Sequence, residues 1–200
     1  MNFLAHCAIA DRAPERAHTD LIAGGFLGDF VKGPVPESLP ATLATGVRLH
    51  RRIDAYSNEH SGIAASCGRF EAPLPRFAPI FVDVVAAPLL ARHWTRFHPR
   101  PLEQFTAETY QAIDRHAHRL PPAGLRFFDY MREADLLARY QGREAMERGL
   151  GAVLRRLRRE ALTAEAIAAV ETLLPALEAD FLDYYPDLVT HAAGWLKNPP

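Results

Sequence analysis

The stretch VRLHRRIDAYSNEH, Val47 to His60, is the part of this chain around which the remaining sequence is best read. In a helix, its residues His50, Asp54 and Asn58 are spaced i, i+4 and i+8 and stack on one face. Burying such polar groups without partners costs about a few kcal/mol each. The face therefore indicates either a polar site able to hold a metal or a solvated surface. The solvated alternative is favoured by three neighbouring arginines, Arg48, Arg51 and Arg52.

Length and composition predict one domain, residues 1–200, with a sizeable core. The chain has 200 residues, of which 48% are hydrophobic. Its net charge of −1 gives no global attraction to nucleic acid or to a membrane. No window approaches the roughly 18 apolar residues of a membrane span. We therefore expect no nucleic-acid or membrane partner, and the sequence leaves the oligomeric state open.

The cysteines and the N-terminus predict a cytoplasmic protein. Cys7 and Cys67 have no C-x-x-C spacing, which favours two small hydrophobic side chains in a reducing compartment. The first residues, MNFLAHCAIADRAPER, lack the basic segment and long apolar run of a signal peptide.

Prolines and helical periodicity predict an all-α, multi-helix bundle without strands. The chain is expected to turn at residues 11–16. The last helix is expected to start at Thr163, to kink or break at Pro175, and to break at Pro186. Gly24 and Gly25 inside a helix cost about 1 kcal/mol each, which favours close approach of another backbone there. The main predicted helices are 2–10, 19–32, a long one starting at Pro40, 80–97, one from Leu102, 127–140 and 144–159.

Polar residues inside apolar helical segments are the candidates for chemistry. His6 lies in NFLAHCAIA, Asp29 in GGFLGDFVKG and Asp83 in PIFVDVVAAPLL. With His50 and Asp54 they supply two imidazoles and three carboxylates, a set that suits Mn²⁺, Fe²⁺, Zn²⁺ or Mg²⁺ in a helix bundle. Such a metal lowers the pKa of bound water and clamps a phosphoryl oxygen, while Arg51 or Arg52 could neutralise a phosphate.

Each of these residues also has a structural interpretation. His6 could be a hydrogen-bonded core histidine, and Asp29 could pair with Lys32 on the surface. Asp83 could favour the N-terminus of its helix electrostatically.

Several motifs resemble the acyl carrier protein phosphodiesterase (acyl carrier protein hydrolyase) family, a divergent branch of the HD-type metal-dependent phosphohydrolases. The motifs are MNFLAH, GDFVKG, LHRRID, D-V…RHW and FLDYYP, spread from Met1 to about Pro186. The resemblance implies a cytoplasmic, HD-domain-like helical enzyme of fatty acid and lipid metabolism that uses a divalent cation, commonly Mn²⁺, with Mg²⁺ or Fe²⁺ as options. The implied reaction is hydrolysis of the phosphodiester between 4′-phosphopantetheine and a serine of holo-acyl carrier protein.

Carried over by motif, the resemblance assigns site residues. The implied metal ligands are His6, Asp29, His50 and Asp83. The implied catalytic residues are Asp29, His50, Asp54 and Arg51, with Arg51 on the phosphate. Because carrier proteins are acidic, recognition is expected to use local basic residues, namely Arg48, Arg51, Arg52 and Lys32.

Two segments depart from the family pattern. The pattern I-D-x-x-T-D reads IDAYSN here, which places Asn58 where an aspartate is expected. The pattern D-x-x-x-D-H-x-L reads DVVAAPLL, so Ala87 and Pro88 replace an Asp-His pair. Loss of supporting polar groups can cost about 10–100-fold in metal affinity or activity. Three functions stay open: an active phosphodiesterase, a catalytically degenerate paralogue that binds acyl carrier protein, and a hydrolase of another phosphodiester.

Overall fold

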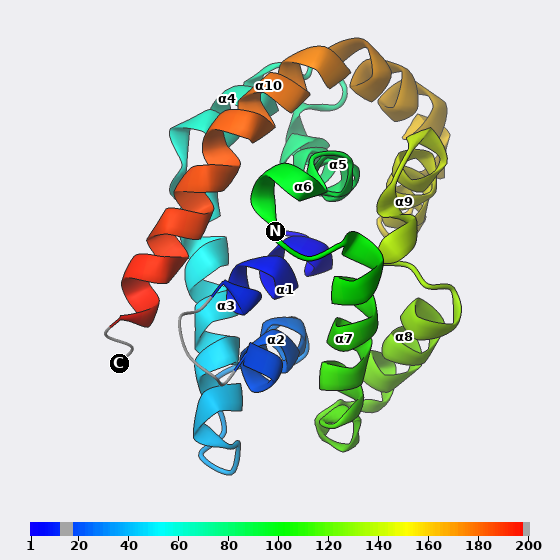
Figure 1. Cartoon of the computed structure of the whole chain (residues 1–200). Helices are drawn as coiled ribbons and strands as arrows, with labels where there is room; N and C mark the ends of the chain where they lie inside the picture. The colour runs from blue at the N-terminus through cyan, green and yellow to red at the C-terminus, as the bar shows by residue number, and fades with distance from the viewer. Residues whose placement is uncertain (13–17, 198–200) are drawn as a thin grey trace.

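The computed structural model describes residues 1–12 and 18–197, and these form ten α-helices without a strand (Figure 1), which confirms the all-α prediction. The first five are α1 (Phe3–Asp11), α2 (His18–Leu27), α3 (Ala41–Glu59), α4 (Ser61–Gly68) and α5 (Ala78–Arg92). The others are α6 (Trp94–Phe97), α7 (Leu102–Asp114), α8 (Pro122–Glu133), α9 (Arg143–Arg156) and α10 (Thr163–Leu196). No helix in the described ranges is long and apolar enough to cross a bilayer.

Helix α1 lies in the middle of the bundle. Its sequence FLAHCAIAD is apolar on nearly every side, so it must be covered all round. It packs against α2, α3, α5 and α10, and Figure 1 shows it at the centre of the molecule. The Asn2 side chain caps it by accepting a hydrogen bond from the Ala5 amide at 3.0 Å. His6 is thereby held in the interior.

Helices α2 and α3 touch through their backbones, as the glycine pair predicted. A Cβ placed on Gly24 would lie 2.4 Å from the Leu43 carbonyl oxygen, and one on Gly46 would lie 2.6 Å from the Leu21 oxygen. Both distances are impossible for real atoms, so glycine is required on both sides of the contact. This contact fixes the distance between the two helices and their position relative to each other.

Helix α10 forms a long arch over α4 and α5 and reaches α3 (Figure 1). Its 34 residues correspond to roughly 50 Å of helix. Both Pro175 and Pro186 lie inside it. Tyr184, Tyr185 and Leu188 are buried on either side of Pro186 and hold the helix together at that point.

Four predicted helices differ from the observed ones in where they begin, break or end. Helix α2 ends at Leu27 instead of continuing to Lys32, because the Asp29 and Phe30 amides donate to the carbonyl oxygens three residues earlier, those of Phe26 and Leu27, as in a turn. Pro186 does not break the last helix, since packing outweighs the roughly 3 kcal/mol cost of an internal proline.

The other two differences lie near helix ends. The predicted helix 80–97 breaks at His93 into α5 and α6. The segment predicted as 127–140 instead starts at Pro122, whose fixed φ suits the first helical position, and ends at Glu133. Of the predicted turn at residues 11–16, Asp11 belongs to α1, and residues 13–16 lie outside the described part of the chain.

The glycine contact gives a stability prediction. We expect Gly46→Ala to lower the free energy of unfolding by about 1–3 kcal/mol or more, because its Cβ meets backbone that cannot move aside. Gly194→Ala is the control: this helical glycine has open space around it, so alanine should raise stability by up to about 1 kcal/mol. Urea unfolding of both variants measures this, and equal stability of Gly46→Ala and the unmodified chain would contradict the tight contact.

Candidate functional site

Three side chains from two helices converge at the centre of the bundle. His6 of α1 and His50 and Asp54 of α3 offer nitrogen and oxygen atoms that all lie within 4.8 Å of one another. His6 Nε2 is 3.1 Å from Asp54 Oδ1, and His50 Nε2 is 3.2 Å from Asp54 Oδ2. The two imidazole rings stack with centroids 3.7 Å apart. We call this group the His6–His50–Asp54 cluster.

The ring of His50 is held by the backbone of α2. Its Nδ1 lies 2.7 Å from the Gly25 carbonyl oxygen, which can only accept, so Nδ1 must carry the hydrogen that it donates. This contact fixes the tautomer and turns Nε2 toward Asp54. Gly28 makes room for the ring, because a Cβ there would lie 2.2 Å from His50 Cγ.

Two more carboxylates and one ammonium group surround the cluster. Asp29, in the turn that follows α2, has Oδ1 4.0 Å from His50 Nε2. The α-ammonium of Met1 lies 2.9 Å from Asp54 Oδ1 and 3.6 Å from Asp83 Oδ1. Asp83 stands in the second turn of α5, beyond the reach of the helix N-terminus, and its Oδ1 is buried without a hydrogen bond in the described residues.

Burial and neighbouring charges shift the pKa values of the groups in and around the cluster in different directions. Burial, assisted by the neighbouring His50, lowers the pKa of His6 to about 3, so this imidazole is neutral. Burial opposes ionisation of Asp54, but contacts with both histidines outweigh it and hold the Asp54 pKa below its usual range. Burial raises the pKa of Asp29 and of Asp83. Asp54 is therefore the permanent anion at the centre.

The cluster fits a divalent cation. With Nδ1 donating to the Gly25 carbonyl, Nε2 is the ring nitrogen of His50 left to meet a metal, and it lies 3.2 Å from Asp54 Oδ2. His6 Nδ1 is buried without a partner in the described residues. The Met1 ammonium beside the same carboxylate shows that this position attracts positive charge. Two imidazole nitrogens and a carboxylate oxygen suit a first-row transition metal.

The remaining candidate residues lie around this cluster in different roles. Arg51 donates from Nη2 to the Val31 carbonyl oxygen at 2.8 Å and so ties α3 to the loop that carries Asp29. No ion pair joins Asp29 to Lys32 in the described residues. Asn58 is exposed one turn beyond Asp54, and Ala87 is buried one turn beyond Asp83.

Sequence reasoning missed three groups of the site. The Gly25 carbonyl, Gly28 and the Met1 amine carry no side-chain chemistry that a motif search would find. The GGFLGDF spacing is the one available signal, because it places two small residues beside the aspartate of the motif. The sequence also placed Asp54 outside the metal-ligand set, although it contacts both histidines.

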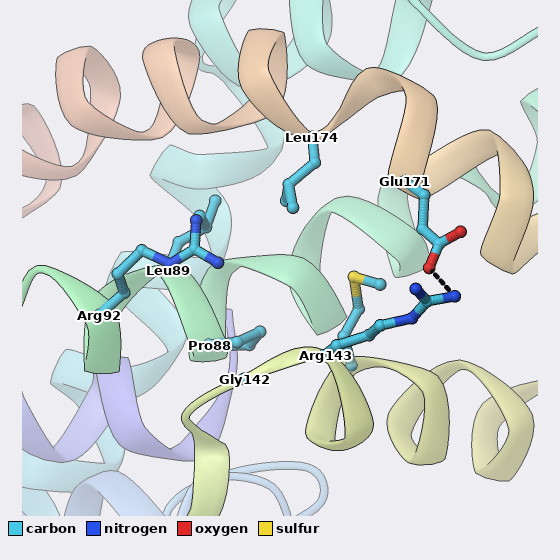
Figure 2. Close-up of a pocket in the computed structure, with 8 residues that line it drawn as sticks. Pro88, Leu89, Arg92, Gly142, Arg143, Glu171 and Leu174 are labelled. Atoms are coloured by element: carbon cyan, nitrogen blue, oxygen red, sulfur yellow. Dashed lines mark ion pairs between the residues drawn. The ribbon is translucent and has the colours of Figure 1, made fainter.

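Two pockets lie on different faces of α5. One, of about 330 Å³, is lined in part by Met1 and Asp83 and adjoins the cluster. The other, of about 360 Å³, lies between α5, α9 and α10 and includes Pro88, Arg92 and Arg143 (Figure 2). Pro88 thus lies in a pocket away from the cluster.

Comparisons with known proteins give a consistent match. The model of the family described as acyl carrier protein phosphodiesterase matches residues 1–188. Similar proteins called acyl carrier protein phosphodiesterase come from Escherichia coli O9:H4 (strain HS), from strain SMS-3-5 / SECEC and from strain K12 / DH10B. Each is 30% identical to this chain over 195 residues, covering 96% of this chain and 98% of the relative. No solved structure matches this chain.

The close contact between Gly28 and the His50 ring gives a prediction about metal affinity. Gly28→Ala should push His50 out of place and weaken Mn²⁺ binding by about 10–100-fold without removing a ligand. Gly68→Ala, where a Cβ meets open space, is the matched control and should bind as the unmodified chain does. Electron paramagnetic resonance of free Mn²⁺ measures both. Unchanged affinity in a folded Gly28→Ala variant would exclude His50 as a ligand.

Proposed function

This chain belongs to the acyl carrier protein phosphodiesterase family, and from that membership we propose that it hydrolyses the phosphodiester between 4′-phosphopantetheine and a serine of holo-acyl carrier protein. The products are apo-carrier protein and free 4′-phosphopantetheine. The observation that carries this proposal within the molecule is the His6–His50–Asp54 cluster, which supplies the donors that a metal-dependent phosphodiesterase needs.

We propose that His6, His50 and Asp54 hold the divalent cation. Mn²⁺ is proposed from the family membership, with Fe²⁺ or Mg²⁺ as options, and the two imidazole donors disfavour Mg²⁺ among the three. A cation there supplies Lewis-acid stabilisation of the phosphoryl oxygens and lowers the pKa of a bound water. The additional ligands proposed from the sequence are Asp29 and Asp83. The buried Oδ1 of Asp83 has no hydrogen bond in the described residues and lies 3.6 Å from the Met1 ammonium.

The residues around the cluster have separable roles in this proposal. Asp54 keeps its negative charge between the two histidines, and the Gly25 carbonyl holds the His50 ring in position. Asp29 lies beside His50 and remains partly open to solvent, so it can orient the attacking water and accept its proton. Arg51, fixed near Asp29 by its bond to Val31, is proposed to neutralise a phosphate oxygen.

The departures from the family pattern lie outside the three-residue cluster. Asn58 is exposed at a pocket wall, Ala87 is buried, and Pro88 lies in the pocket between α5, α9 and α10. None of them has to coordinate for His6, His50 and Asp54 to do so. This arrangement supports an active enzyme over a degenerate binding paralogue.

Broader features of the proposal follow from the same membership. We propose an HD-like relationship of the fold, a role in fatty acid and lipid metabolism, and one domain formed by the whole chain. The core supports a single domain, because buried residues from Leu4 in α1 to Ala192 in α10 form one cluster. The cytoplasmic location, the lack of a nucleic-acid or membrane partner and the hydrolysis of another phosphodiester stay predictions of the sequence.

The activity has a direct test. Purified holo-acyl carrier protein should convert to the apo form with Mn²⁺ and remain unchanged with a chelator, as followed by mobility on a native gel. Asp54→Asn should lower the rate by at least about 10²-fold, because it removes the charge at the centre of the cluster. Arg156→Glu on exposed α9 is a control that should convert normally. Binding of holo-carrier protein without metal-dependent conversion would instead support the degenerate paralogue.

Recognition of the acidic carrier has its own prediction. Arg48 is exposed on α3, beside the cluster in sequence and on the helix that carries it. Arg48→Glu should raise KM for holo-carrier protein by about tenfold and weaken its dependence on salt, with little change in kcat. The charge-matched control is again Arg156→Glu, since α9 lies across the molecule from α3 (Figure 1). Equal KM values for the two variants would place the docking surface elsewhere.

A further inference from the structure

The pocket that adjoins the cluster has a volume of about 330 Å³, at the lower end of the range of roughly 300–1,000 Å³ for small-molecule sites. We call it the α3–α5 pocket, and residues of α3, α4, α5 and α10 line it. Met1 and Asp83 belong to its wall, and the Met1 ammonium also contacts Asp54. A group attached to a phosphate at the cluster therefore has this pocket as neighbouring space.

The wall of the α3–α5 pocket is uncharged away from the cluster. The Met1 ammonium and the Asp83 carboxylate are the charged groups among its lining residues. Ile63, Val82 and Ala64 provide apolar surface. Such a wall suits a ligand that is charged at one end and neutral along the rest of its length.

Asn58 adds hydrogen-bonding capacity to this neutral wall. It is exposed, and its side chain has no hydrogen bond within the described residues. An amide side chain can donate and accept at the same time, whereas a carboxylate at this position could only accept. It can therefore pair with amide groups of a ligand.

We propose that the α3–α5 pocket receives the pantetheine arm of the carrier protein while its phosphate lies at the cluster. This inference rests on the proposed function. Beyond its phosphate the arm is neutral, with a branched dimethyl group, two amides and a terminal thiol, which matches apolar walls with an unpaired amide. Asn58, which departs from the family pattern, becomes a specificity residue for the arm.

The pocket of Figure 2 does not meet the same requirement. Pro88, Leu89 and Arg92 follow Asp83 by five, six and nine residues, which places them about 120–180° around α5 from it. The guanidinium groups at this pocket are already paired, Arg92 with Glu178 and Arg143 with Glu171. It offers neither continuity with the cluster nor a free charge.

Two adjacent exposed alanines of α4 provide a matched test. Ala64 lines the α3–α5 pocket, and Ala65 does not. Because both side chains are exposed, phenylalanine at either position should leave folding intact, which thermal unfolding checks. The readout is calorimetric binding, in Mn²⁺ buffer, of 4′-phosphopantetheine compared with inorganic phosphate. The ratio of the two dissociation constants isolates the contribution of the arm.

The inference expects unmodified protein and Ala65→Phe to bind 4′-phosphopantetheine at least about tenfold more tightly than phosphate, and Ala64→Phe to lose that preference. Asn58→Ala should reduce the preference partly. A preference retained in Ala64→Phe, or absent from the unmodified protein, would overturn the pocket assignment.

Conversion of holo-carrier protein to the apo form tests the proposed function independently of the pocket. If the unmodified protein shows the preference but does not convert holo-carrier protein, the proposed hydrolysis is wrong and the pocket assignment is retained. If it converts holo-carrier protein and Ala64→Phe does so with an unchanged KM, the pocket fails and the hydrolysis stands.

Discussion

Helices α2 and α3 meet at Gly24 and Gly46 with no side chain between them, and the position of the His50 ring beside α2 depends on this contact. At this separation the Gly25 carbonyl reaches His50 Nδ1, and Gly28 leaves the space that the His50 ring fills. A single methyl group in the contact would move α3 away from α2. The hydrogen bond from His50 Nδ1 to the Gly25 carbonyl would then be lost or lengthened. The close packing of the two backbones thus also determines where the His50 ring lies.

Asp54 makes most of the charged contacts in the site. One carboxylate faces two imidazoles and an ammonium group, and His6 lies wholly inside the protein. The imidazole of His6 is buried and the carboxylate of Asp54 is partly exposed, and a positive species that contacts both stabilises the pair. The cluster therefore combines one negative charge, already contacted by the Met1 ammonium, with two imidazoles, and this combination suits the binding of a divalent cation.

Helix α5 separates two environments because its faces are covered by different helices. The face with Asp83 adjoins α1 and the α3–α5 pocket, while the face with Pro88 and Arg92 turns toward α9 and α10. The substitutions at positions 87 and 88 consequently alter buried packing and a separate pocket and leave the cluster intact.

The sequence by itself determined the helical class, most helix starts, and the i, i+4 placement of His50 and Asp54 on one face. These depend on groups within a turn or two of each other: apolar periodicity, prolines at breaks, and the i, i+4 spacing of one helix. Only the tertiary structure decided that His6 joins them across 48 residues, that Asp29 stands in a turn after α2, and that α10 continues through Pro186. Such outcomes depend on which surfaces pack together, because the burial of many side chains can outweigh the local cost of a glycine, a proline or an unpaired polar group.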